Sequence, residues 1–209
     1  MKRKVKSYLV FAPLLYRVVM FMLVPMILIF YYYLVRDSIA EAGLIVVMVM
    51  LVMAEIVMDV WLLGGIQSKE AEKLDVLKTS GRGMEVMHSA LKLDLVRRFL
   101  TIAGIMGICY WLSGIQDRIQ LVAVGIYFAL IAYIISTLGV LIGRYGGTIW
   151  INVAISYFAA LVVVLSQFLP GLKQYAVFYD LGLGVLTIVV SIVAVRIAMK
   201  KVEGSYYDK

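Results

Sequence analysis

Residues 18–35 read VVMFMLVPMILIFYYYLV, eighteen consecutive positions without a charged side chain. A helix of this length just crosses the hydrocarbon core of a bilayer, which is roughly 30 Å thick. Five further apolar runs follow, and the six together predict membrane spans at about 18–35, 42–63, 99–115, 119–142, 149–169 and 181–199. The expected fold class is therefore all-α, a polytopic membrane protein with about six transmembrane helices.

The composition agrees with a single transmembrane domain over residues 1–209. Hydrophobic residues make up 64% of the chain, whereas soluble domains are about 45–50% apolar. Six spans of roughly 20 residues leave only short connections. Residues 1–17, a basic head followed by an apolar stretch, are expected to form an interfacial helix that turns near Pro13 and leads into the first span.

The formal charge of +7 raises the question of a nucleic-acid partner. The basic residues are confined to segments near or between the apolar runs, a pattern that membrane topology produces, so no nucleic-acid partner is expected. On one side of the six-span arrangement lie 17 of them: Lys2, Arg3, Lys4, Lys6, Arg17, Lys69, Lys73, Lys78, Arg82, Lys92, Arg97, Arg98, Arg144, Arg196, Lys200, Lys201 and Lys209. The other side has three, Arg36, Arg118 and Lys173. Because positive charge is retained in the cytoplasm, both termini are expected to be cytoplasmic, with the chain in the inner (cytoplasmic) membrane of a bacterial cell.

The residue types that usually carry catalysis are scarce. Cys109 is the single cysteine and lies in an apolar run, and His88 is the single histidine. Neither a nucleophile with an adjacent base nor a set of Cys and His metal ligands can be assembled from them. We therefore expect no enzyme activity, no metal site and no cofactor held by this chain.

Two acidic residues interrupt the second apolar run. Glu55 and Asp59 are one helical turn apart and share a face. An unpaired carboxylate in hydrocarbon costs several kcal/mol, so such residues face the bundle interior, a water-filled cavity or a cation. For Asp59, near the cytoplasmic end, we expect snorkelling or pairing with a loop or terminal base. For the deeper Glu55 the alternatives are a conduit or a buried ion pair.

Gly139, Gly143 and Gly147 are spaced four residues apart and share one helix face. Such a face permits close approach of another helix backbone. We expect it to serve packing within the chain rather than dimerisation.

The polar segment at residues 64–98 is the largest piece outside the predicted spans. Residues 68–78 are charged and favour a helix, and glycines at 81 and 83 then suit a turn. From Met84 an amphipathic helix, with Met87, Leu91 and Leu95 on its apolar stripe and Glu85, Lys92 and Asp94 off it, should run straight into the third span. This helix either rests on the headgroups, held by Arg97 and Arg98, or forms part of a docking element.

The chain resembles the small permease subunits of ABC exporters of the type 2 class. The resemblance rests on the basic N-terminus ending in Ala12-Pro-Leu-Leu-Tyr-Arg17, on six spans with both ends inside, and on the loop sequences at residues 64–69 (GGIQSK) and 77–83 (LKTSGRG). It implies a coupling helix at about 68–77. One feature departs from that family, because only residues 170–180 separate the last two spans, too few for the two short re-entrant helices usual there.

The resemblance implies a permease subunit that exports an amphipathic or hydrophobic substrate, as a homodimer or paired with a second permease. A separate ATPase subunit would bind the ATP and dock on the coupling loop, with Leu74 and Leu77 as apolar anchors. The rim of that contact would be Lys69, Glu70, Lys73 and Asp75. Two alternatives stay open: the substrate-binding membrane component of a vitamin-type importer, and a membrane assembly or accessory factor that transports nothing.

Overall fold

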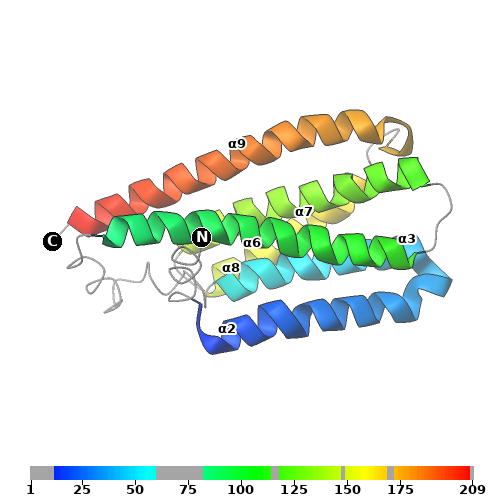
Figure 1. The fold of residues 1–209 in the computed structure, drawn as a ribbon, viewed down its shortest axis with the longest axis horizontal. Coiled ribbons are helices and arrows are strands. Elements are labelled where there is room, and N and C mark those ends of the chain that lie inside the picture. The colour runs from blue at the N-terminus through cyan, green and yellow to red at the C-terminus, as the bar shows by residue number, and fades with distance from the viewer. Residues whose placement is uncertain (1–11, 60–81, 114–117, 147–148, 169–171, 208–209) are drawn as a thin grey trace.

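The computed structural model describes residues 12–59, 82–113, 118–146, 149–168 and 172–207, and every element in them is helical. The first span begins with α2 (Leu14–Val18) and a single π-helical turn, η1 (Val19–Leu23), and continues in α3 (Val24–Asp59). The other long helices are α6 (Gly83–Leu112), α7 (Arg118–Gly146), α8 (Ile149–Leu165) and α9 (Leu172–Tyr207), with a short 3-10 turn, η3 (Ser166–Phe168), after α8. Figure 1 shows them side by side as an elongated bundle.

Helix α3 reverses direction and supplies parts of two spans. A Cβ at Gly43 would lie 2.9 Å from Cγ2 of Val35 and 3.4 Å from the ring of Tyr32. In a straight helix, residues 32 and 43 are about 16 Å apart along the axis. The chain therefore folds back between the apolar stretches Leu14–Ser38 and Ala42–Asp59, as the change from blue to cyan in Figure 1 shows.

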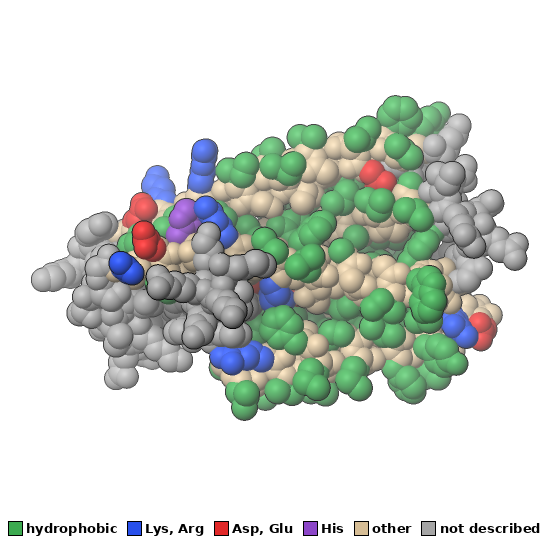
Figure 2. All heavy atoms as spheres, viewed as in Figure 1, with side chains coloured by type: hydrophobic (Ala, Val, Ile, Leu, Met, Phe, Trp, Pro, Cys, Tyr) green, Lys and Arg blue, Asp and Glu red, His purple; other side chains and the backbone are tan. Residues whose placement is uncertain are grey.

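Six apolar helical stretches confirm the predicted fold class. Five are long and apolar enough to cross a membrane: Leu14–Ser38, Ala42–Asp59, Gly83–Leu112, Val122–Arg144 and Val177–Lys200. The sixth, Val153–Leu165, is shorter. Large hydrophobic side chains cover the outside of the bundle (Figure 2), and Trp111 and Trp150, near opposite ends, are 79% and 81% exposed. An apolar exterior with tryptophans near its ends suits a lipid environment.

The two ends of the bundle differ in charge. Charged side chains gather at the end to which α9 brings the C-terminus, on the left of Figure 2, where α3 ends and α6 begins. We call this the Tyr207 end, and the opposite end, which α6 reaches, the Leu112 end. Leu14–Arg17, expected in a separate interfacial helix, instead continue without a break into the first span after the extended Pro13. Residues 1–11 lie outside the described part of the chain.

The main hydrophobic core lies between α3, α6, α7 and α8. It includes Val47, Leu51, Ile102, Ala132 and Val163. A second, smaller core at the Tyr207 end joins α2, α6 and α9 and contains Tyr16, Met20, Met87, Leu91 and Ala198. The burial of Met87 and Leu91 confirms the apolar stripe that the sequence predicts for α6.

Candidate functional site

Two carboxylates enter the bundle interior from α3. Glu55 is 1% exposed and Asp59 is 4% exposed. They face the same way because they are one helical turn apart. Glu55 lies about 20 Å of helix from Ala42, which places it roughly two-thirds of the way across the hydrocarbon core from the Leu112 end.

Helix α6 brings three charged residues to the same level. Asp94, Arg97 and Arg98 are all buried. Arg97 and Arg98 follow Asp94 by three and four residues, a spacing at which helical side chains meet, and both form ion pairs with it. Arg144 comes from the last turns of α7, and its side chain is 7% exposed.

Glu55 is held by both arginines of α6. Arg97 donates to it through Nη1 at 2.8 Å and through Nη2 at 2.7 Å, a bidentate contact, and Arg98 Nε donates at 3.3 Å. The Arg97 guanidinium also lies over the ring of Tyr16, 5.7 Å from its centroid. The two-pronged geometry makes the Glu55–Arg97 pair strong and specific.

Asp94 joins the remaining charges. It accepts from Arg97 at 3.1 Å, from Arg98 at 3.0 Å and from Arg144 at 3.0 Å. Arg144 in turn donates to Asp59 through Nε at 2.7 Å and through Nη2 at 2.6 Å. The six residues thus form one continuous network, which we call the charge cluster: Glu55, Asp59, Asp94, Arg97, Arg98 and Arg144.

The charge cluster is electrically neutral, with three carboxylates and three guanidinium groups. Removing a charge from water costs several kcal/mol, and this cost is offset only when each charge meets a partner in good geometry. All three carboxylates accept from guanidinium groups, so their chemistry here is ion pairing rather than metal coordination. Within the described residues, no group of three or more His, Cys, Asp or Glu is arranged to hold a metal ion.

These contacts select among the sequence-based alternatives for the acidic pair. Glu55 takes part in a buried ion pair. Asp59 pairs with Arg144, a base that the sequence placed in the loop after the fourth predicted span and that the structure places in the last turns of α7. The interpretation of Arg97 and Arg98 as anchors in the headgroups is wrong, since both side chains are buried among the carboxylates.

Sequence reasoning missed Asp94 and Arg144 as site residues. Asp94 was placed only off the apolar stripe of its helix, and Arg144 was counted only as a basic residue after the fourth predicted span. One signal was present: two acidic residues near the end of one span require cations, and the neighbouring spans offer arginines at the same end. The residues expected to dock an ATPase (Lys69, Glu70, Lys73, Leu74, Asp75 and Leu77) lie outside the described residues.

The glycine face of α7 packs inside the bundle. A Cβ at Gly139 would lie 2.5 Å from Cδ1 of Ile56 on α3 and 3.5 Å from Cγ2 of Ile155 on α8. Gly143 is also buried, whereas Gly147 lies outside the described residues. At Gly139 the absent side chain lets three helices approach closely, which is the packing role that the sequence predicts.

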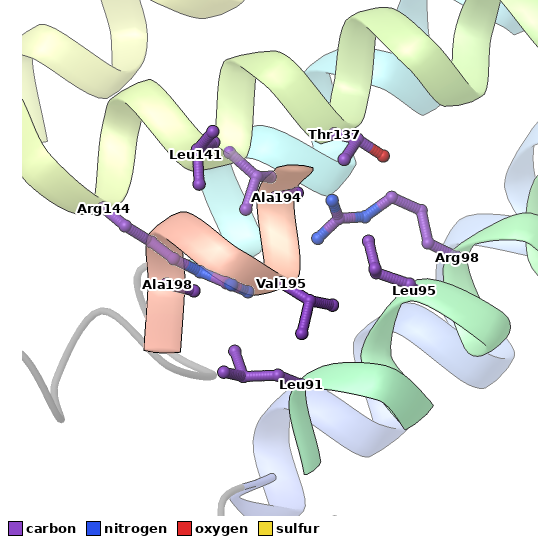
Figure 3. Close-up of a pocket in the computed structure, with 10 residues that line it drawn as sticks. Leu91, Leu95, Arg98, Thr137, Leu141, Arg144, Ala194, Val195 and Ala198 are labelled. Carbon is purple, nitrogen blue, oxygen red and sulfur yellow. The ribbon is translucent and has the colours of Figure 1, made fainter. Parts of the chain in front are cut away.

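A small pocket adjoins the charge cluster where α6, α7 and α9 meet (Figure 3). Its polar lining is Arg98, Arg144 and Thr137, and the rest is apolar, including Leu91, Leu95 and Val195. Its volume is about 10 Å³, about the space that one water molecule needs. It is too small for an organic substrate.

Comparisons of the chain with models of protein families, with curated proteins and with solved structures found no match. The site itself is a neutral cluster that ties three membrane helices together at the Tyr207 end, beside a pocket the size of a water molecule.

Proposed function

We propose that the chain is the membrane-spanning permease subunit of an ABC-type transporter, an exporter of an amphipathic or hydrophobic substrate driven by a separate ATPase subunit. The observation that supports this function best is the course of α6. The helix starts at Gly83, a few residues after the coupling helix expected at about 68–77, and runs unbroken to Leu112.

Helix α6 can transmit a displacement from its Gly83 end into the bundle. About 16 Å of it lies on the Tyr207 side of Asp94. Along that length Met87 and Leu91 pack with Tyr16 and Ala198, on α2 and α9. At Asp94 the charge cluster then clamps the helix to α3 and α7. A push on the Gly83 end would therefore reach all of these helices, because packed interiors transmit displacement.

The route of the substrate is expected at an interface between two subunits. The pocket beside the charge cluster holds about one water molecule, and the cluster itself leaves no carboxylate free to bind a cargo. A second bundle, from a copy of this chain or from another permease, would complete the path.

The test separates docking from coupling. Parent protein purified from its native membrane in mild detergent should carry an ATPase subunit and hydrolyse ATP. Leu74→Asp with Leu77→Asp should release that subunit, because loss of a central apolar anchor costs about 2 kcal/mol or more, roughly thirtyfold in affinity. Arg97→Gln should keep the ATPase bound and lower its hydrolysis, because α6 loses its bidentate contact with Glu55 on α3 and is held less firmly.

A matched control is Lys92→Gln, which removes one positive charge from an exposed position on the same helix. It should leave both binding and hydrolysis at the parent level. Equal loss of hydrolysis in Lys92→Gln and Arg97→Gln would contradict a role for the charge cluster in coupling.

One observation favours a different function, that of an assembly or accessory factor without transport. The charge cluster is neutral and each of its carboxylates is paired, as expected of a purely structural element. Absence of any ATPase from the gently purified parent protein would replace the transporter proposal with this one.

A further inference from the structure

Buried oxygens without a hydrogen-bond partner recur along the seam between α7 and α9. Among the described residues they include Oγ1 of Thr137 on α7, and Oδ1 of Asp180 and Oγ1 of Thr187 on α9. A buried polar atom with no partner is costly, and most so inside a membrane, where no bulk water is at hand. Three such atoms along one seam call for a common explanation.

The polar residues of α9 share one face. Asp180, Gly184, Thr187 and Ser191 are spaced four, three and four residues apart, which aligns them along the helix over about 16 Å. The face meets α7, because the Ser191 Oγ and the Tyr133 hydroxyl are 2.8 Å apart. Near the Leu112 end the rings of Tyr179 and Tyr127 also touch, with centroids 6.1 Å apart.

The face is open at Gly184. A Cβ at Gly184, midway between Asp180 and Thr187, would meet no atom within 4 Å. Toward the Tyr207 end the seam reaches the small pocket, where Thr137, Arg98 and Arg144 surround α9 at Ala194 and Ala198 (Figure 3). The unpartnered oxygens, the open glycine and the pocket therefore follow one another along a single line.

We propose that the seam between α7 and α9 is a hydrated path for small cations, with Asp180 as the binding group near the Leu112 end. A chain of water molecules satisfies the threonine oxygens, since a buried water typically makes two to four hydrogen bonds. Oδ1 of Asp180, unlike the carboxylates of the charge cluster, receives no guanidinium hydrogen bond and is available to a cation. At the other end the path stops at the small pocket, where the paired arginines Arg98 and Arg144 close it. The path does not depend on an ATPase partner.

Thiol reactivity tests the hydration. In a Cys109→Ala background, Thr187→Cys and Ser191→Cys place thiols in the seam. Ile188→Cys and Ile192→Cys place them at the next residue along the helix, on the exposed side of α9. The probe is a membrane-impermeant methanethiosulfonate carrying a trimethylammonium group, applied to native membrane vesicles of both orientations. Since only the thiolate reacts and thiolate requires water, the seam positions should react roughly tenfold or more faster than their neighbours. Equal rates within each pair would overturn the proposal.

A bulky side chain placed in the seam tests from which end the reagent enters. Gly184 and Gly182 both have open space at their Cβ positions, but residues two apart on a helix point to different sides. Gly184→Leu should suppress the reaction at Thr187→Cys and Ser191→Cys with reagent supplied at the Leu112 end, and Gly182→Leu should not. Unchanged rates with Gly184→Leu would exclude this path.

The charge of the probe tests the role of Asp180. A methanethiosulfonate with a sulfonate group is the anionic counterpart of the first reagent. Asp180→Asn, which is nearly isosteric, and Asp180→Ser should each lower the ratio of cationic to anionic reaction rates at Thr187→Cys. A ratio equal to that of the parent in both variants would refute cation binding by Asp180 even if the seam is wet.

Discussion

At the scale of single residues, Glu55 and Arg97 show how a charged pair is tolerated inside a membrane bundle. Their side chains are 1% and 8% exposed and meet through two hydrogen bonds of 2.7 and 2.8 Å. Burying either charge without the other would cost several kcal/mol of desolvation free energy. The ion pair offsets this cost for both side chains. Stability should therefore depend on keeping the charge balance more than on keeping either residue.

Glu55→Gln should lower the free energy of unfolding by about 3–5 kcal/mol, because it leaves a buried guanidinium short of a counter-charge. The double variant Glu55→Gln with Arg97→Gln should lose distinctly less than the sum of the two single losses. Thermal unfolding in detergent measures both. Glu85→Gln removes a carboxylate from an exposed position of α6 and should change little. Additive losses in the double variant would contradict the pairing.

The charge cluster shows where sequence reasoning stops at this scale. Glu55 stood out because an acidic residue deep in an apolar run has few explanations. Arg97 and Arg98 did not, because they precede the predicted third span and the length of α6 on the Tyr207 side is not visible from hydropathy. Their partner choice depends on how α6 is rotated against α3, which no periodicity in one chain specifies.

At the scale of elements, the six apolar helices were predictable because spanning a bilayer demands about 20 apolar residues each. The packing between these helices was less predictable from the sequence. Gly139 was singled out by its spacing from Gly143, but the identity of its neighbours, Ile56 and Ile155, follows only from the tertiary arrangement. The single helical run from Leu14 into the first span was not predicted either, because residues 1–17 were expected to form a separate interfacial helix with its turn near Pro13.

Gly139→Ala tests the contact between α7 and α3. Its Cβ would overlap Cδ1 of Ile56 at 2.5 Å, so Ile56 must move, at an expected cost of about 1–3 kcal/mol. Ile56→Val removes Cδ1, and combined with Gly139→Ala it should recover part of the loss. The measurement is again the unfolding temperature in detergent.

Gly104→Ala is the matched control, because a Cβ at Gly104 meets no atom within 4 Å. In a helix interior this change should be neutral or stabilise by about 0.5–1 kcal/mol. A Gly139→Ala variant as stable as Gly104→Ala would show that α7 does not press against α3 at this point.

At the scale of the whole molecule, the charge cluster changes the argument for orientation without reversing it. Arg97, Arg98 and Arg144 are paired inside the bundle, so they no longer count as free positive charges near the Tyr207 end. Of the 17 basic residues assigned to that side, 14 remain, against three on the other. The excess still predicts a cytoplasmic Tyr207 end, because retention of Lys and Arg sets topology.

Labelling of single cysteines in intact cells tests this orientation. In a Cys109→Ala background, cysteines at Ser38, Gln116 and Gln174 lie at or beyond the Leu112 end of the predicted spans and should react with an impermeant thiol reagent. Cysteines at Ser68 and Ser205 belong to the predicted cytoplasmic side and should react only after the cells are opened. Labelling of Ser68→Cys and Ser205→Cys in intact cells, with Ser38→Cys protected, would mean that the bundle is inserted the other way round. In that case the polar segment would face away from any cytoplasmic ATPase, and the proposed drive through α6 would fail together with the topology.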